Sequence, residues 1–149
     1  MKKILYCFGA IALLSACTKK TENKETDTST VTNTKQTDFS GLYSYQQNGD
    51  TITLQLTVDG TKANGNLLYA LNEKDRNSGS FVGEIKDGIL LANYTFSSEG
   101  VLSERQIAFK LTDTSAVEGY GDVQEINGKM VFKDAANLEY GTGLVLTKK

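Results

Sequence analysis

The chain has 149 residues, which is enough for one domain with a hydrophobic core but too few for two. Its formal net charge of -2 gives no basic excess for nucleic-acid binding, and it has no histidine, the commonest acid–base and metal-ligand side chain near neutral pH. With hydrophobic residues at 39% and charged residues at 23%, the composition is typical of a globular protein.

Residues 1–16 predict a signal peptide. Two lysines precede an apolar run from Ile4 to Leu14, which is too short for a stable membrane-spanning helix. The run ends in Leu14-Ser15-Ala16-Cys17, a quartet that resembles the bacterial lipobox. The resemblance implies cleavage before Cys17 and attachment of acyl chains, palmitate among them, as a membrane anchor. The alternative is an ordinary secreted protein, but Cys7 leaves with the signal and Cys17 then has no disulfide partner.

Residues 17–38 predict the lipidated cysteine followed by a disordered tether. The segment holds eight threonines, and its one aliphatic residue is Val31, so it cannot bury enough surface to offset the entropy of ordering. Thr18, rather than Asp, follows Cys17. By analogy with enteric bacteria this predicts the outer membrane, with the periplasmic and the outer face both left open.

Residues 39–149 predict an all-β domain. Five turn signals interrupt this region, at Asn48-Gly49, Asp59-Gly60, Asp87-Gly88, Glu99-Gly100 and Asn127-Gly128. Apolar and polar residues alternate between the turns, and no stretch has helical periodicity. The predicted strands are 39–47, 51–58, 62–71, 79–86, 89–98, 102–112, 115–126, 129–133 and 142–147. An antiparallel up-and-down meander of about eight or nine strands is expected to close into a barrel, because closure removes exposed edges. A β-sandwich is the alternative.

Strand parity predicts an arginine inside this barrel. If Ile107 and its alternate neighbours point inward, Arg105 points inward too. A buried arginine is costly without a partner, and the adjacent strands offer Glu118 and the hydroxyl of Tyr94. Whether Glu118 points inward or outward is left undecided by the sequence, because Val117, which would face the opposite way, is an equally good inward residue. These three residues predict either a ligand site for a carboxylate or other anion, or a structural buried pair. Arg105 facing solvent is the third alternative.

The stretch "NEKDRNSG" predicts a loop at one end of the barrel. Up-and-down connectivity places loops 48–50, 72–78, 98–101 and 127–128 at the end opposite the tethered N-terminus. Glu73, Asp75, Arg76 and Glu99 are therefore candidate recognition residues at this mouth. The alternative is a solvated hairpin loop whose charges pair with each other.

Catalysis and metal binding have little support in the sequence. The domain has neither Cys nor His for a nucleophile and its base, so we expect a protein that is not an enzyme. Asp75-x-Asn77-x-Gly79 lacks most of the ligands of a calcium loop, and no glycine-rich phosphate loop opens a helix. We expect no cofactor, no metal and no nucleic-acid partner, and a monomeric state. Inward-capable glycines (Gly65, Gly83, Gly119, Gly121) favour space inside the barrel, or else mark its bends.

Several motifs resemble those of a known group of proteins. The lipobox, the threonine-rich tether and the motifs "FSGLYSY", "EKDRNSG", "YTFSSEG" and "EGYG" together resemble small single-domain lipoproteins of Bacteroidota. In addition, Gly41-Leu42-Tyr43 resembles the Gly-x-Trp of the first lipocalin strand, although Tyr replaces Trp and no arginine lies near the C-terminus. The resemblance implies a lipocalin-like barrel. The predicted function is binding of a small or amphipathic ligand in the cell envelope; a protein-interaction or hydrolase-inhibitor module using the mouth loops is the alternative.

Overall fold

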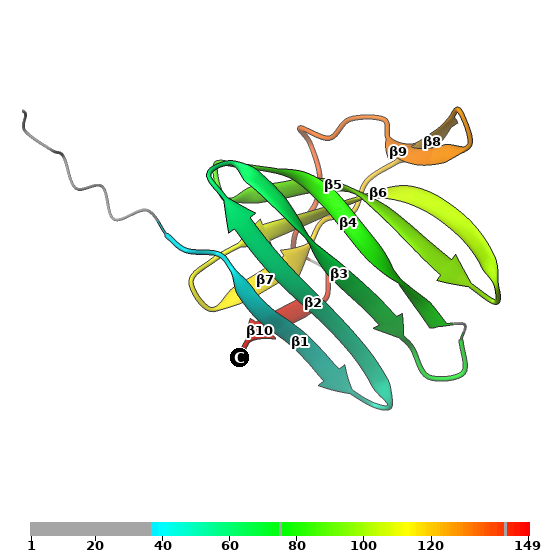
Figure 1. The fold of residues 1–149 in the computed structure, drawn as a ribbon, viewed down its shortest axis with the longest axis horizontal. Coiled ribbons are helices and arrows are strands. Elements are labelled where there is room, and N and C mark those ends of the chain that lie inside the picture. Colours follow the sequence, from blue (N-terminus) through cyan, green and yellow to red (C-terminus); the bar gives the residue numbers. More distant parts are fainter. Residues whose placement is uncertain (1–36, 75, 142) are drawn as a thin grey trace, which may run out of the picture. The chain divides into compact units, whose positions relative to one another are not determined.

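The computed structural model describes residues 37–149, apart from residues 75 and 142. The predicted signal peptide, Cys17 and nearly all of the tether lie outside the described residues. The strands are β1 (Gly41–Gln47), β2 (Asp50–Asp59), β3 (Lys62–Ala70), β4 (Arg76–Lys86), β5 (Ile89–Ser98), β6 (Val101–Leu111), β7 (Ser115–Glu118), β8 (Val123–Ile126), β9 (Lys129–Phe132) and β10 (Val145–Lys148) (Figure 1). Within the described residues, no helix is long and apolar enough to cross a membrane.

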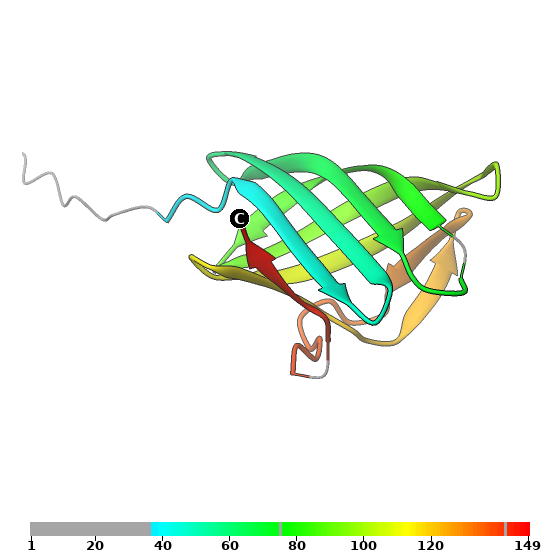
Figure 2. The same cartoon turned by 90° about the horizontal axis from the view of Figure 1, so that it is seen from below.

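Eight of the strands close into an antiparallel barrel. Each strand from β1 to β6 pairs with the next along the chain, β7 pairs with β10, and β10 pairs with β1 (Figures 1 and 2). The strand pair that closes the barrel is short, since β10 pairs with β1 only at Tyr43 and Ser44. The predicted all-β meander with a closed barrel is confirmed, and the sandwich is not formed.

Bulky side chains fill the barrel. Register places Tyr43, Leu54 and Leu67 side by side across β1, β2 and β3, and each is at most 1% exposed. Phe81, Tyr94 and Phe109 continue this inner layer on later strands. The alternation that predicted the strands is thus the alternation between this core and the outer face.

Gly65 and Gly83, two of the four inward-capable glycines, leave no space inside the barrel. A Cβ at Gly65 would lie 1.8 Å from the carbonyl oxygen of Gln55, and one at Gly83 would lie 2.5 Å from the Cβ of Ala92. Neighbouring strands therefore pack directly on Gly65 and Gly83, so the preference for an interior space was wrong at these two positions, whereas Gly119 and Gly121 line a cavity.

The predicted strand 115–126 is two strands. β7 ends at Glu118, the chain leaves the barrel through Gly119 and Gly121, and β8 begins at Val123. The loop that follows β9 crosses at this point, because a Cβ at Gly119 would lie 2.5 Å from the ring of Tyr140. The last strand is also displaced, to Val145–Lys148 instead of 142–147.

β8 and β9 form a hairpin attached to the barrel. β9 runs parallel to β6, with Glu104 opposite Lys129 and Arg105 opposite Met130 (Figure 1). Lys129 and Glu104 form an ion pair across this junction. The parallel register brings the β8–β9 turn to the start of β6, at the same end as the β1–β2 and β5–β6 turns, as connectivity predicted.

Candidate functional site

Arg105 lies on β6 and points into the barrel, as its parity predicted. Its Cζ lies 5.0 Å from the ring centre of Tyr69, 5.7 Å from that of Tyr94 and 5.4 Å from that of Phe96. The rings of Tyr94 and Phe96 stack on each other at 4.9 Å. Three aromatic faces therefore surround the guanidinium, and each offers the negative face of its π system to the cation.

Tyr94 contributes its ring to this site, whereas the predicted contribution was its hydroxyl. The hydroxyl donates instead to the carbonyl oxygen of Leu67 at 2.8 Å. Burial raises the pKa of Tyr94 to about 12, although the positive charge of Arg105 opposes the shift. The phenol is therefore a fixed structural donor, and only its face is available to the cation.

Glu118, and not Val117, points into the barrel. It lies opposite Phe109 in the β6–β7 register and is 7% exposed. The hydroxyl of Tyr69 donates to its Oε1 at 2.5 Å, and that of Tyr120 donates to its Oε2 at 2.9 Å. Burial and the charge of Glu118 raise the pKa of both tyrosines well above the ordinary value. Both phenols consequently keep their protons and remain donors to this carboxylate.

Arg105 and Glu118 do not form the ion pair that one prediction expected. Among the described residues no carboxylate oxygen lies within 4.0 Å of the Arg105 guanidinium, and its buried Nε has no hydrogen-bond partner. Tyr69 lies between the two charges, with its ring against Arg105 and its hydroxyl on Glu118. The arginine thus keeps unused hydrogen-bonding capacity in a partly buried position.

A cavity of about 260 Å³ joins these charged groups to apolar walls. Arg105 and Ile107 of β6 and Glu118 of β7 line it on the barrel side. The other lining residues come from the chain that follows β7 and from the β8–β9 hairpin: Gly119, Tyr120, Gly121, Val123, Met130 and Phe132, with Gln106 of β6. Tyr120, Val123 and Met130 are among the large apolar side chains that remain exposed, at 40% to 44%. The cavity therefore has one positive and one negative side chain at its base, Arg105 and Glu118, and an apolar entrance.

Hydrogen bonds hold the β8–β9 hairpin in place as one wall of the cavity. The side-chain Oε1 of Gln106 accepts a hydrogen bond from the Phe132 backbone amide at 3.0 Å, and the Lys133 amide donates to the Asp122 carbonyl at 2.8 Å. Together with the short parallel pairing to β6, these bonds hold Met130 and Phe132 on the Arg105 side. The segment that leaves the barrel after β7, together with the β8–β9 hairpin, therefore forms one side of the cavity.

The predicted mouth residues lie apart from this cavity. Glu73 has a positive φ of 56° and lines a separate hollow with Phe96, Arg76 begins β4, and Glu99 occupies the β5–β6 turn. Asp75 lies outside the described residues. The three ion pairs of the described residues all arise elsewhere, so they do not support the alternative in which these loop charges pair with each other.

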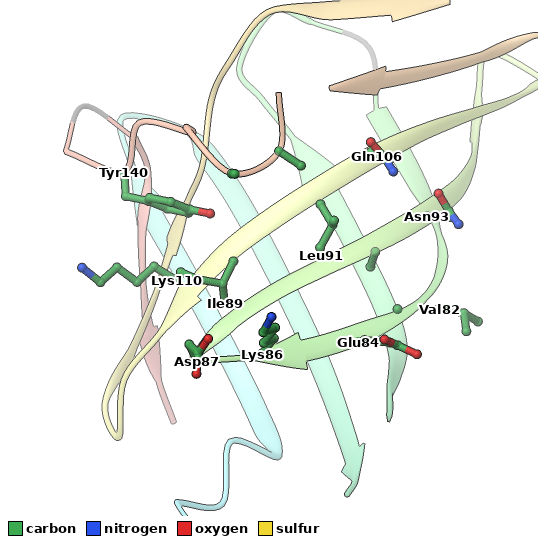
Figure 3. Close-up of a pocket in the computed structure, with 14 residues that line it drawn as sticks. Val82, Glu84, Lys86, Asp87, Ile89, Leu91, Asn93, Gln106, Lys110 and Tyr140 are labelled. Atoms are coloured by element: carbon green, nitrogen blue, oxygen red, sulfur yellow. The ribbon is translucent and has the colours of Figure 1, made fainter. Parts of the chain in front are cut away.

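The outer face of the barrel carries a larger groove of about 800 Å³. It lies over β4, β5 and β6 and is bounded by the loop that follows β9. Figure 3 shows Tyr140 at one end and Val82 and Glu84 at the other, with Ile89 and Leu91 between them. Charges of both signs, such as Lys86 and Asp87, line the groove. The charged side chains of this groove are exposed to solvent, whereas the Nε of Arg105 is buried without a hydrogen-bond partner. The Arg105 cavity is therefore the better candidate for a specific ligand.

Sequence reasoning missed the residues that complete the site. Tyr69 and Phe96 lie on the inward faces of β3 and β5, and their signal was the same alternation that located Arg105. Tyr120 and the hairpin residues Val123, Met130 and Phe132 carried no such signal, because the chain there leaves the barrel. Among the described residues, no group of three or more Cys, Asp or Glu side chains is placed to hold a metal ion.

Comparison with known proteins identifies no relative for this chain. It matches no family model, and no curated protein or solved structure is significantly similar to it.

Proposed function

We propose that this protein is a non-enzymatic binding protein of the cell envelope, which holds a small anionic, amphipathic ligand in the Arg105 cavity. The observation that carries the proposal is an arginine within an aromatic cage that lacks a carboxylate partner and faces a cavity with apolar walls. A carboxylate or similar anion on the ligand satisfies the guanidinium, and the body of the ligand covers Val123 and Met130.

The tyrosines favour binding over chemistry. Their raised pKa values mean that Tyr69 and Tyr120 stay protonated near neutral pH and do not act as bases there. They hold Glu118 in one orientation, as expected for a preorganised recognition site.

A binding measurement tests this proposal. The probe is 3-phenylpropanoate, which carries one carboxylate and one apolar group, titrated by calorimetry into the full chain purified in detergent. We expect saturable binding that Arg105→Gln weakens at least tenfold. Arg76→Gln is the matched control, because it makes the same change of charge on the exposed first residue of β4. No binding of the probe, or equal weakening by both variants, would contradict a site at Arg105.

We further propose that Cys17 carries the lipid that places this site in the outer membrane. Support comes from the lipobox Leu14-Ser15-Ala16-Cys17 and from the resemblance to lipoproteins of Bacteroidota. Labelled palmitate is expected in the wild-type chain and in Cys7→Ser, but not in Cys17→Ser. Label retained in Cys17→Ser would refute the anchor.

A protein-interaction module at the barrel mouth is the second candidate, favoured by one observation. Val101 and Leu102 at the start of β6 are 64% and 72% exposed, and Ile126, which precedes the β8–β9 turn at the same end of the barrel, is 48% exposed. A photoreactive amino acid at position 102 should then cross-link one defined envelope protein in cells, while the same group at Lys62, at the other end of the barrel, should not.

A further inference from the structure

Two opposite charges face the same cavity without pairing. Arg105 and Glu118 both line the 260 Å³ cavity, yet their charged atoms are more than 4.0 Å apart. Tyr69 spans the gap, with its ring centre 5.0 Å from Arg105 Cζ and its hydroxyl 2.5 Å from Glu118 Oε1. The two charges are therefore held apart by the Tyr69 ring, and both line the one cavity from which a ligand could reach them.

We infer that the ligand is a small zwitterion with an apolar side chain, in the manner of a free α-amino acid. This inference rests on the proposed binding function and names the class of ligand. The carboxylate of the ligand binds Arg105 and its ammonium binds Glu118. The cavity itself carries one charge of each sign, so a zwitterion leaves neither charge uncompensated after water is displaced.

Both charged groups retain the capacity for these bonds. A guanidinium has five donors, and the Nε of Arg105 is buried without a partner. A carboxylate accepts about four hydrogen bonds, and each oxygen of Glu118 receives one phenol. The two phenols thus orient the carboxylate and leave lone pairs that an ammonium group can use.

The apolar walls select the rest of the ligand. Val123, Met130 and Phe132 face the charges from the hairpin, and Ile107 closes the barrel side. A volume of 260 Å³ accommodates one side chain of the size of phenylalanine or leucine beyond the charged groups, but not a long chain.

Three matched probes test this inference on the unchanged full chain, purified in detergent and titrated by calorimetry. L-Phenylalanine carries both charges, 3-phenylpropanoate lacks the ammonium, and 2-phenylethylamine lacks the carboxylate. We expect phenylalanine to bind at least about tenfold more tightly than 3-phenylpropanoate, because it adds one charge-assisted hydrogen bond. We expect 2-phenylethylamine to bind most weakly, since it leaves Arg105 without an anion.

A substitution of Glu118 tests whether this residue causes the preference for phenylalanine over 3-phenylpropanoate. Glu118→Gln keeps the shape of the side chain and removes its charge, so phenylalanine and 3-phenylpropanoate should bind this variant within about threefold of each other. Glu73→Gln, at the mouth, should leave the preference unchanged. Circular dichroism checks that both variants are folded, and the comparison of probes on the wild-type chain stands without them.

The outcomes separate this inference from the function on which it rests. Equal affinity of the wild-type chain for phenylalanine and 3-phenylpropanoate overturns the zwitterion and leaves the anion site intact. Tightest binding of 2-phenylethylamine overturns both proposals, as does an absence of binding by all three probes.

Discussion

The hydrogen bond from Tyr69 to Glu118 gives the sharpest test of the site. Tyr69→Phe deletes one oxygen, which lies 2.5 Å from a carboxylate that is 7% exposed. Tyr45→Phe is the matched control, because its hydroxyl bonds the exposed Gln47 at 2.9 Å. Both substitutions remove the hydroxyl of a tyrosine. The hydroxyl of Tyr69 donates to a buried charged acceptor, and that of Tyr45 donates to an exposed neutral one.

The expected magnitudes differ clearly. A hydrogen bond to a charged group contributes about 1.5–3 kcal/mol, and the loss leaves a buried carboxylate oxygen without its donor. Tyr69→Phe should therefore lower the free energy of unfolding by about 2–3 kcal/mol, whereas Tyr45→Phe should change it by less than about 0.5 kcal/mol. Urea unfolding followed by far-ultraviolet circular dichroism measures both, and the midpoint for Tyr69→Phe should fall by about 1–2 M.

Equal effects of the two substitutions would refute the reasoning. They would show that water reaches Glu118 freely, so that the lost phenol is replaced at no cost. A sheltered Arg105 cavity would then not exist in solution. A larger loss for Tyr69→Phe, with an unchanged dependence on urea concentration, would place the effect in the folded state.

Three further substitutions test the fold. Because burial raises the pKa of Tyr94 to about 12, the unfolded chain ionises first as the pH rises. Between pH 10 and pH 12 the stability of the wild type should therefore fall by about 2 kcal/mol more than that of Tyr94→Phe, as measured by urea unfolding at each pH. In the same assay Phe109→Ala should lower the free energy of unfolding by about 3–5 kcal/mol, because Phe109 is fully buried. Val82→Ala, at an exposed position, should lower it by less than about 0.5 kcal/mol. Similar losses for the two variants would mean that the barrel is loosely packed. Gly65→Ala would place its Cβ 1.8 Å from a backbone oxygen of the neighbouring strand, so circular dichroism should show no folded protein, in contrast to Gly141→Ala, which meets nothing within 4 Å.

Much of the barrel was predictable, because strand alternation and tight turns are local properties. At Asn48-Gly49 and three of the other predicted turns both residues have positive φ, as a two-residue hairpin turn requires. Alternation also placed Arg105 inside, since a period of two relates it directly to Ile107. The same argument did not settle Glu118, because its strand is only four residues long and both of its faces carry an apolar residue, Ala116 on one and Val117 on the other.

The sequence by itself determined the first six strands, the turns between them and the inward arginine, because each of these depends on residues close together along the chain. Tertiary structure alone decided the site. Tyr69 and Glu118 are 49 residues apart, and their contact depends on how the barrel closes. Where the chain leaves the barrel after Glu118, Gly119 packs against the ring of Tyr140, and β9 is held parallel to β6 by the hydrogen bond between Gln106 and Phe132, which are 26 residues apart. Pairing between distant segments is set by the whole fold, and no local pattern of apolar residues encodes it.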